Sequence, residues 1–110
     1  MFRNGLDMEL IPVLREGFKG GKSIQELMVD ILKWNSYDEY ESVMLGAYFR
    51  QAFCLTIRES GVAIGARLPW SGAKVDYDAL LRGDFGDFTD LKALIESRRS
   101  KWEFDGADCT

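Results

Sequence analysis

The fold of this chain is decided by one apolar stretch at positions 36–59, which reads SYDEYESVMLGAYFRQAFCLTIRE. Between positions 40 and 53 its apolar residues fall on nearly every side of a helix, and only a narrow polar strip remains. A helix of this kind is buried on most of its surface at the centre of a domain. We therefore expect a central helix at about 37–53, opened by a capping box between Ser36 and Glu39.

The end of this stretch has two interpretations. Thr56 and Glu59 repeat the spacing of a capping box, which predicts a break near 54–55 and a short second helix at 57–63. Alternatively, the central helix continues without a break and ends at Gly61. We favour the break, because the same spacing opens two other expected helices.

Two more helices are expected before this stretch. Ser23 and Glu26 have the capping-box spacing, and apolar residues follow at the i, i+3, i+4 and i+7 positions of one helix face. This pattern predicts a helix at 23–35. Helical spacing also indicates a helix at about 9–18, with Pro12 in the first turn, where the missing N–H is not needed.

Turn residues and apolar spacing predict the segments after the central stretch. In order, they are an irregular loop at 64–75, a short helix at 76–81 that Asp76 caps, a Gly/Asp turn region at 82–88, a helix at 89–102 and a loose tail from about 104. A short strand at 62–68 is an alternative, but it has no convincing partner strand. The sequence therefore predicts a single all-α domain over residues 1–110, with four to six helices around a central one.

Composition excludes several classes of function. The chain has 110 residues, of which 46% are hydrophobic, and this is typical of one globular domain. It has no histidine, which excludes a Ser-His-Asp triad, a Cys-His dyad and a histidine metal site. The two cysteines, Cys54 and Cys109, lack the C-x-x-C spacing of a structural zinc site. We expect no metal and no cofactor.

The cysteines and the absence of a targeting pattern predict a cytoplasmic protein. Cys54 lies in an apolar run and Cys109 is next to the last residue, so we expect a buried free thiol and a frayed terminal one. Free thiols are typical of the reducing cytosol. No segment resembles a signal peptide, and no apolar run approaches the ~18 residues of a membrane span.

The acidic excess of the chain is confined to one segment. The formal net charge is -4, and residues 76–90 account for all of it with five aspartates and one arginine. The residues before and after this segment are neutral in sum. Because the segment would repel phosphates, binding to nucleic acid is not expected.

Several motifs of catalysis and metal binding are incomplete. The GKS sequence at 21–23 resembles the end of a phosphate-binding loop, but Glu16 stands where that motif needs its first Gly. A calcium loop beginning at Asp76 would need a ligand and a Gly at two positions that hold leucine. The DFG sequence at 84–86 lacks the other motifs of a kinase. A helix-turn-helix is disfavoured, because its second helix would begin with acidic residues.

Three aspartates raise the question of acid–base catalysis. Asp84, Asp87 and Asp90 could act as a paired acid and base, but no histidine is present to activate a nucleophile beside them. Helix capping and a solvated surface explain these carboxylates better. We therefore expect a protein that is not an enzyme.

Aromatic residues are interleaved with the aspartates of the acidic segment. Aromatic anchors inside a charged rim are typical of protein-binding surfaces. The alternative is that the aromatic side chains belong to the core and that the aspartates only face water. The first interpretation predicts a partner-binding surface formed by Trp70, Asp76, Tyr77, Asp78, Asp84, Phe85, Asp87 and Asp90.

The segment from Ala47 to Glu59, AYFRQAFCLTIRE, resembles a helix–break–helix segment of small bacterial proteins. With the expected helices at 76–81 and 91–102, the layout of residues 36–102 is similar to that of small acidic immunity proteins from bacterial toxin–immunity systems. The resemblance rests on layout and charge and assigns no binding residues. It implies a cytosolic, non-enzymatic protein that binds a cognate toxin domain, often a basic nuclease.

We therefore expect an immunity or inhibitor protein whose acidic, aromatic surface covers a basic active site and mimics the charge of nucleic acid there. Two other classes stay open. A small helical regulator of nucleic acid would carry a basic patch, and a small-molecule-binding protein would have a closed apolar pocket with a desolvated carboxylate. The oligomeric state also stays open, because the aromatic patch near Trp70 could equally form a homodimer. No membrane partner is expected.

Overall fold

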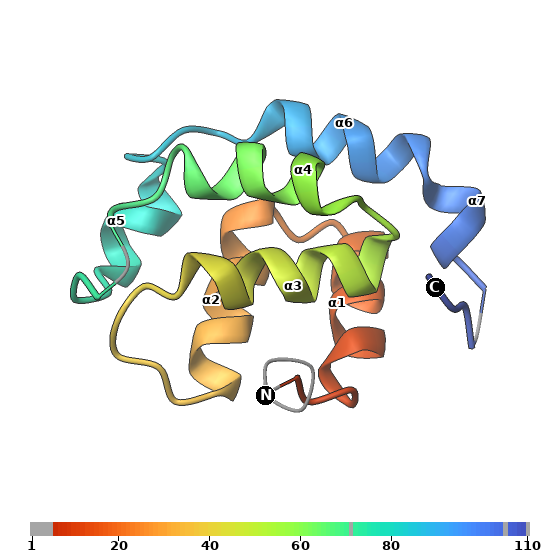
Figure 1. The fold of residues 1–110 in the computed structure, drawn as a ribbon, viewed down its shortest axis with the longest axis horizontal. Helices are drawn as coiled ribbons and strands as arrows, with labels where there is room; N and C mark the ends of the chain where they lie inside the picture. The colour runs from red at the N-terminus through yellow and green to blue at the C-terminus, as the bar shows by residue number, and fades with distance from the viewer. Residues whose placement is uncertain (1–5, 71, 105, 110) are drawn as a thin grey trace.

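The computed structural model describes residues 6–70, 72–104 and 106–109, and the remaining positions of the expected domain lie outside the described residues. Within these ranges the chain forms an all-α globule without β-strands, as expected (Figure 1). Its seven α-helices and one π-helical segment are α1 (Leu10–Lys19), α2 (Ile24–Trp34), α3 (Ser42–Phe53), α4 (Ile57–Ser60), η2 (Gly61–Gly65), α5 (Tyr77–Arg82), α6 (Thr89–Ser97) and α7 (Arg99–Trp102). None of these helices has the length and apolarity that crossing a membrane requires.

The central helix of the structure is α3. It packs against α1, α2, α7 and the pair formed by α4 and η2, and Figure 1 shows it lying across α1 and α2. Its side chains Leu45, Tyr48, Phe49 and Phe53 are fully removed from solvent. The expectation of a buried central helix is therefore confirmed.

The start of α3 differs from the expected position. The helix begins at Ser42 rather than near 37, and the expected capping box between Ser36 and Glu39 does not form. Ser36 instead adopts the left-handed region with a φ of 57°, and Tyr40 pairs its backbone with the loop before α5. Because Tyr40 becomes buried to 1% exposure in this pairing, a long-range contact prevails over the local preference for a capped helix.

The other two capping boxes are present. Ser23 and Glu26 exchange side-chain-to-backbone hydrogen bonds at the start of α2, and Thr56 and Glu59 do the same at the start of α4. Cys54 ends α3 in a left-handed conformation with a φ of 58°. The expected break is thus confirmed, and the alternative of an uninterrupted helix is wrong. Beyond the break, α4 passes directly into η2.

The C-terminal helix is divided at Arg98, where φ is -102° and ψ is 7°. This division is the reason that the structure has more helices than the expected four to six. It directs Trp102 into the core, where its ring contacts Phe18 and Phe53 at centroid distances of 5.6 and 5.0 Å. The buried indole donates its N–H to the carbonyl oxygen of Ile95 at 3.0 Å, so the polar atom of this large side chain is satisfied.

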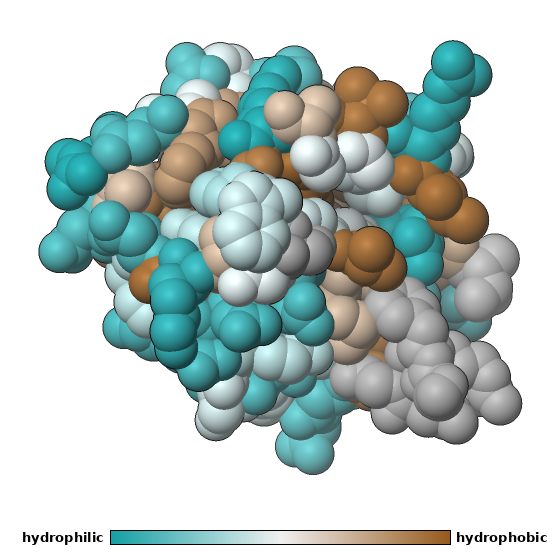
Figure 2. All heavy atoms as spheres, turned by 60° about the vertical axis from the view of Figure 1, so that its left-hand side comes forward, coloured by the Kyte–Doolittle hydropathy of each residue, from teal (hydrophilic) through white to brown (hydrophobic). Residues whose placement is uncertain are grey.

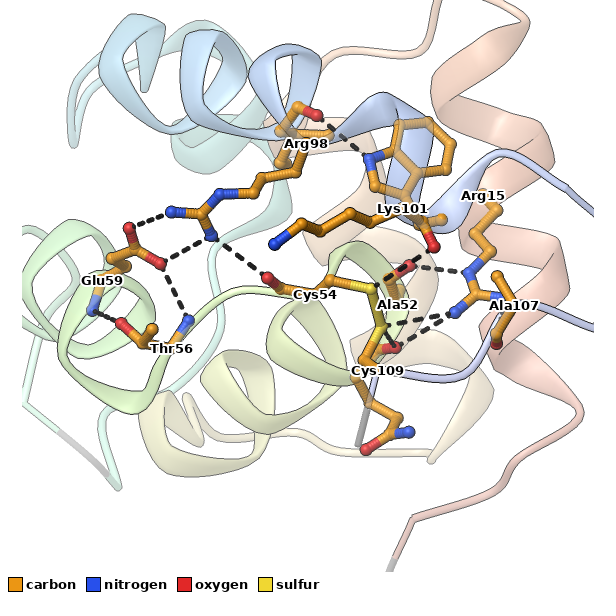
Figure 3. Close-up of a disulfide and its surroundings, with 12 residues drawn as sticks. Arg15, Ala52, Cys54, Thr56, Glu59, Arg98, Lys101, Ala107 and Cys109 are labelled. Carbon is orange, nitrogen blue, oxygen red and sulfur yellow. Dashed lines mark hydrogen bonds and ion pairs between the residues drawn. A yellow bond between two sulfur atoms is a disulfide. The ribbon is translucent and has the colours of Figure 1, made fainter.

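A disulfide joins Cys54 to Cys109, so the expectation of two free thiols is wrong (Figure 3). The two residues are 55 positions apart in sequence, but their Cα atoms are 4.8 Å apart. Sequence spacing could not show this, because the chain after α7 returns to the left-handed end of α3. The bond ties residues 106–109, where the sequence predicts a loose tail, to the centre of the fold.

Arg15 of α1 reinforces this connection. Arg15 is only 9% exposed. Its guanidinium donates hydrogen bonds to the carbonyl oxygens of Ala52 at 2.7 Å, Gln51 at 3.3 Å and Ala107 at 3.0 Å. Burial lowers the pKa of Arg15, but a guanidinium stays charged at neutral pH. One cation thus satisfies carbonyls at the end of α3 and holds the C-terminal segment against them.

Arg98 links α4 to the junction of α6 and α7. Its guanidinium donates to the two carboxylate oxygens of Glu59 at 2.9 and 2.6 Å and to the carbonyl oxygen of Cys54 at 3.1 Å. The hydrogen bonds from Arg98, followed by the one from the backbone N–H of Thr56, lower the pKa of Glu59 to about 2. Figure 3 shows this ion pair beside the disulfide.

Loss of the disulfide should destabilise the fold by about 2–4 kcal/mol, because the bond closes a long loop and restricts the unfolded chain. Urea unfolding would compare the oxidised wild type, the reduced wild type and the Cys54→Ser/Cys109→Ser variant. We expect the last two to share a lower midpoint. Equal midpoints for the oxidised and reduced protein would contradict a stabilising role of the bond.

The ion pair of Glu59 with Arg98 predicts a specific loss of stability in acid. The pKa of Glu59 is about 2 in the folded protein, below its ordinary value of 4.5. The stabilisation is therefore complete above the unfolded-state pKa and is lost as the pH falls toward 2. We expect Glu59→Gln to lower the free energy of unfolding at neutral pH by about 1–2 kcal/mol, and to flatten its decline in acid, as measured by urea unfolding.

Glu26→Gln is the matched control for this experiment. Glu26 holds the same capping-box position in α2, and the described residues include no arginine that pairs with it. Glutamine also fits this position of a capping box. Parallel acid profiles for the two variants would show that Arg98 does not stabilise the fold through Glu59.

Candidate protein-binding surface around α5

Local sequence fixes the short helix that carries the predicted surface. The carboxylate of Asp76 accepts the N–H of Ala79 at 3.0 Å and caps the start of α5. Gly83 ends the helix in the left-handed region with a φ of 85°, which glycine adopts without steric cost. The expected capping role of Asp76 is confirmed. This carboxylate is exposed and also supports the helix.

Tyr40 attaches α5 to the body of the protein. Its hydroxyl accepts the N–H of Asp76 and donates to the carbonyl oxygen of the same residue, both at 3.2 Å. The ring of Phe85 meets the Tyr40 ring edge-on at 5.9 Å. The hydroxyl of Tyr77 donates to the carbonyl oxygen of Tyr37 at 3.4 Å. Tyr77 and Phe85 are therefore half-buried and pack against the body, which leaves only part of each ring accessible to a partner.

Trp70 is the most exposed aromatic side chain of the predicted set, with 75% of its surface accessible. It lies in a turn in which the N–H of Ala73 donates to the carbonyl oxygen of Trp70 at 3.1 Å. Gly72 has a φ of 98°, and a Cβ atom at this position would lie 3.2 Å from the indole ring. The absence of a side chain at Gly72 thus makes room for the indole beside the backbone. The turn itself is anchored, since Gly72 donates to the carbonyl oxygen of Tyr40 at 3.1 Å.

The predicted aspartates divide into two groups around two arginines. Arg82 pairs with Asp84 at 2.7 Å, and this hydrogen bond, with the nearby charges of Asp76 and Asp78, raises the pKa of Arg82. The structure therefore brings Asp76, Asp78 and Asp84 together on α5 and the turn after it. Arg82 lies among them and offsets part of their charge.

The second group belongs to α6 and its N-terminal turn. Asp90 accepts two hydrogen bonds of 2.6 Å from Arg67, which lower the pKa of Asp90. Asp87 accepts from the N–H and the hydroxyl of Thr89, and these bonds lower the pKa of Asp87. Asp84, Asp87 and Asp90 are each held by a different partner. They therefore do not form the paired acid and base that catalysis would need.

Two further carboxylates lie beside the segment that leads into α5, and the sequence pattern did not indicate them. The backbone of residues 38–40 pairs antiparallel with residues 72–75 through three hydrogen bonds of 2.8 to 3.1 Å. This pairing places Asp38 and Glu39 next to the Trp70 turn, and Asp38 forms an ion pair with Lys74 at 3.2 Å. A helix at 37–53 was expected here, so the pattern assigned these acids to another element.

We define the acidic surface as Trp70 together with the carboxylates that the pairing and α5 bring to this end of the molecule. Its members are Trp70, Asp38, Glu39, Asp76, Asp78 and Asp84. Figure 2 brings this end forward and shows a largely hydrophilic face with a few apolar residues among the polar ones. Lys74 and Arg82 lie beside it, each paired with one of these carboxylates. A third cation, Lys33, lies 5.2 Å from the centroid of the Tyr77 ring of α5.

The described residues place no three or more cysteine, aspartate or glutamate side chains where they could hold a metal ion together. In comparisons with known proteins, no family model, no curated protein and no solved structure matches this chain. The candidate site therefore rests on its own geometry. It consists of one exposed indole on an anchored turn with carboxylates around it.

Asp76 and Asp78 should differ in their effect on stability, although both are exposed acids of the same surface. We expect Asp76→Ala to lower the free energy of unfolding by about 1 kcal/mol, because the cap of α5 is lost. Asp78→Ala should change it by less than about 0.5 kcal/mol. Urea unfolding at neutral pH measures both. Equal effects of the two substitutions would contradict the capping role of Asp76.

Proposed function

We propose that this protein is a non-enzymatic binding protein of the immunity or inhibitor type, which uses the acidic surface to cover a basic region of another protein. The observation that carries the proposal is Trp70, which is 75% exposed on a turn held by backbone hydrogen bonds. A tryptophan is among the residues that contribute most to binding when a partner covers them. An apolar side chain of this size gains most from being buried.

The anchored turn supports the proposal in a second way. Binding is opposed by the entropy lost when mobile side chains and loops become ordered. The Trp70 turn is already paired with Tyr40, which α5 also contacts. Little further ordering of the backbone would therefore be needed on binding.

The carboxylates around Trp70 determine the chemistry of the partner. The acidic surface holds five carboxylates and one indole, and three cations lie beside it: Lys74, Arg82 and Lys33. A basic partner would be attracted at long range, and the attraction would weaken as salt screens it. A basic nuclease or toxin domain fits this chemistry, because its own active site must attract nucleic acid. The inhibitor would then block access to that site.

The cellular location bears on the redox state in which this function is carried out. A cytoplasmic location stays a prediction, and the disulfide weighs against it, because such bonds persist in oxidising compartments. Reduction would remove one of the two contacts that hold the C-terminal segment, which lies on the other side of the fold from α5 (Figure 1). The experiment below therefore uses the oxidised chain.

The test compares three variants as bait in extracts of the source organism, with the captured proteins identified by mass spectrometry. The first variant is Trp70→Ala, and the second is Asp38→Asn/Asp78→Asn/Asp84→Asn, which leaves the capping Asp76 in place. The third, a control, neutralises three acids elsewhere: Glu9→Gln/Glu16→Gln/Glu96→Gln. We expect a basic protein to be captured by the wild type and the control, and lost from the first two baits.

Affinity for the captured protein, once purified, is then measured by calorimetry. We expect each of the first two variants to bind at least about tenfold more weakly, a difference of about 1.4 kcal/mol, and wild-type binding to weaken with added salt. Unchanged affinity of both variants would overturn the proposal. So would an acidic partner, or a homodimer in sedimentation analysis that Trp70→Ala dissociates.

A further inference from the structure

A second exposed surface lies on α3, α4 and η2 and shares no residue with the acidic surface. Three apolar side chains protrude there: Val43 is 72% exposed, Ile57 is 72% exposed and Val62 is 63% exposed. Soluble proteins expose single apolar residues routinely, but neighbouring ones of this exposure indicate an interaction site. We call these three residues and the two grooves beside them the apolar ridge.

Each side of the ridge has a groove. One groove has a volume of about 150 Å³, and its walls include Val43 and Gly46 of α3 and Ile57 of α4. The other has a volume of about 380 Å³, and its walls include Val62 of η2 and Leu94 of α6. The segment formed by α4 and η2 is the wall that both grooves share.

The π-helical segment explains why this wall projects. Ala63 and Ile64 of η2 are buried, whereas Val62 points outward. A Cβ atom at Gly61 or at Gly65 would meet no atom from outside its own helical segment within 4 Å, so open space flanks the backbone there. Short π-helical turns are rare and frequently occur at functional sites.

Charge on the ridge differs from charge on the acidic surface. Arg50 lines the smaller groove and Arg58 lines the larger one. Neither side chain has a hydrogen-bond or ion-pair partner among the described residues. The carboxylates that line the larger groove, Glu59 and Asp90, are already held by arginines. The surface therefore offers two cations without partners.

We propose that the apolar ridge binds an acidic amphipathic helix of a protein partner. Side chains that protrude by this much are removed from water by a broad surface, whereas a small molecule in one groove would leave them exposed. A ridge between two grooves is the form that packs against the side-chain rows of a helix. The partner's apolar residues would cover Ile57 and Val62, and its carboxylates would pair with Arg50 and Arg58.

Two other occupants fit the charges less well. A symmetric dimer through this face would bring Arg50 and Arg58 of both copies into one interface. The carboxylates of the larger groove would not neutralise these cations, because they are already paired with other arginines. Binding of a protein to an anionic membrane is strengthened by about 1 kcal/mol for each basic residue near the membrane surface. Two arginines on a chain with a net charge of -4 provide little attraction of that kind.

The probe is a synthetic 18-residue helical peptide with leucines on one face and glutamates on the other. A second peptide carries lysine in place of glutamate. The disulfide-bonded full chain is titrated with each, and the methyl NMR signals of Val43, Ile57 and Val62 report the site. We expect the acidic peptide to shift these signals and to bind at least tenfold more tightly than the basic one.

Variants separate the two parts of the surface. Ile57→Ser/Val62→Ser and Arg50→Gln/Arg58→Gln should each weaken binding of the acidic peptide at least tenfold. Lys92→Gln/Lys101→Gln is the matched control, since it removes two cations whose side chains also lack ion-pair partners among the described residues. It should leave the affinity unchanged. Circular dichroism verifies that every variant keeps the wild-type helix content.

Four results would overturn the proposal. They are absence of binding, equal binding of the two peptides, concentration-dependent dimerisation that Ile57→Ser/Val62→Ser abolishes, and binding to phosphatidylglycerol vesicles that exceeds binding to the peptide. All variants here lie outside the acidic surface. Failure of this proposal would therefore leave the proposed function of the acidic surface intact. Failure of that proposed function would likewise leave the binding of a helix to the apolar ridge intact.

Discussion

The C-terminal end of α3 lies inside the protein, so its carbonyl groups must find donors from other parts of the chain. Arg15 of α1 supplies hydrogen bonds to Gln51 and Ala52, and Arg98 supplies one to Cys54. Cys54 also carries the disulfide to Cys109. Helix α1, the junction of α6 and α7, and the C-terminal segment therefore meet at one point. The position of each depends on how α3 ends.

The same point determines the location of the apolar ridge. The left-handed Cys54 turns the chain so that Thr56 can cap α4, and Arg98 holds the Glu59 that completes this cap. With α4 fixed against α3, η2 buries Ala63 and Ile64 and leaves Val62 outside. An exposed surface thus follows from the way a buried helix terminates.

The other end of α3 produces the acidic surface through a different kind of contact. Tyr40 is buried, and its backbone and hydroxyl bind the Trp70 turn and the start of α5. This one residue draws acids from two distant parts of the sequence to the same side. The chain consequently offers two surfaces of different chemistry that share no residue. One is acidic and carries an exposed indole, and the other is apolar and carries two arginines that have no ion-pair partner among the described residues.

The sequence by itself determined the all-α class, the buried central helix, the break after Phe53 and the caps of α2, α4 and α5, because these depend on hydrogen bonds and side-chain spacing within one helical turn. It also indicated the exposed Trp70 and the aspartates of α5. Only the tertiary structure decided that Ser36 does not open α3, that Cys54 joins Cys109, that Asp38 and Glu39 lie beside α5, and that Asp87 and Asp90 belong to a separate group. Each of these depends on contacts between residues far apart in the chain. Local spacing contains no information about which distant segment supplies the competing partner.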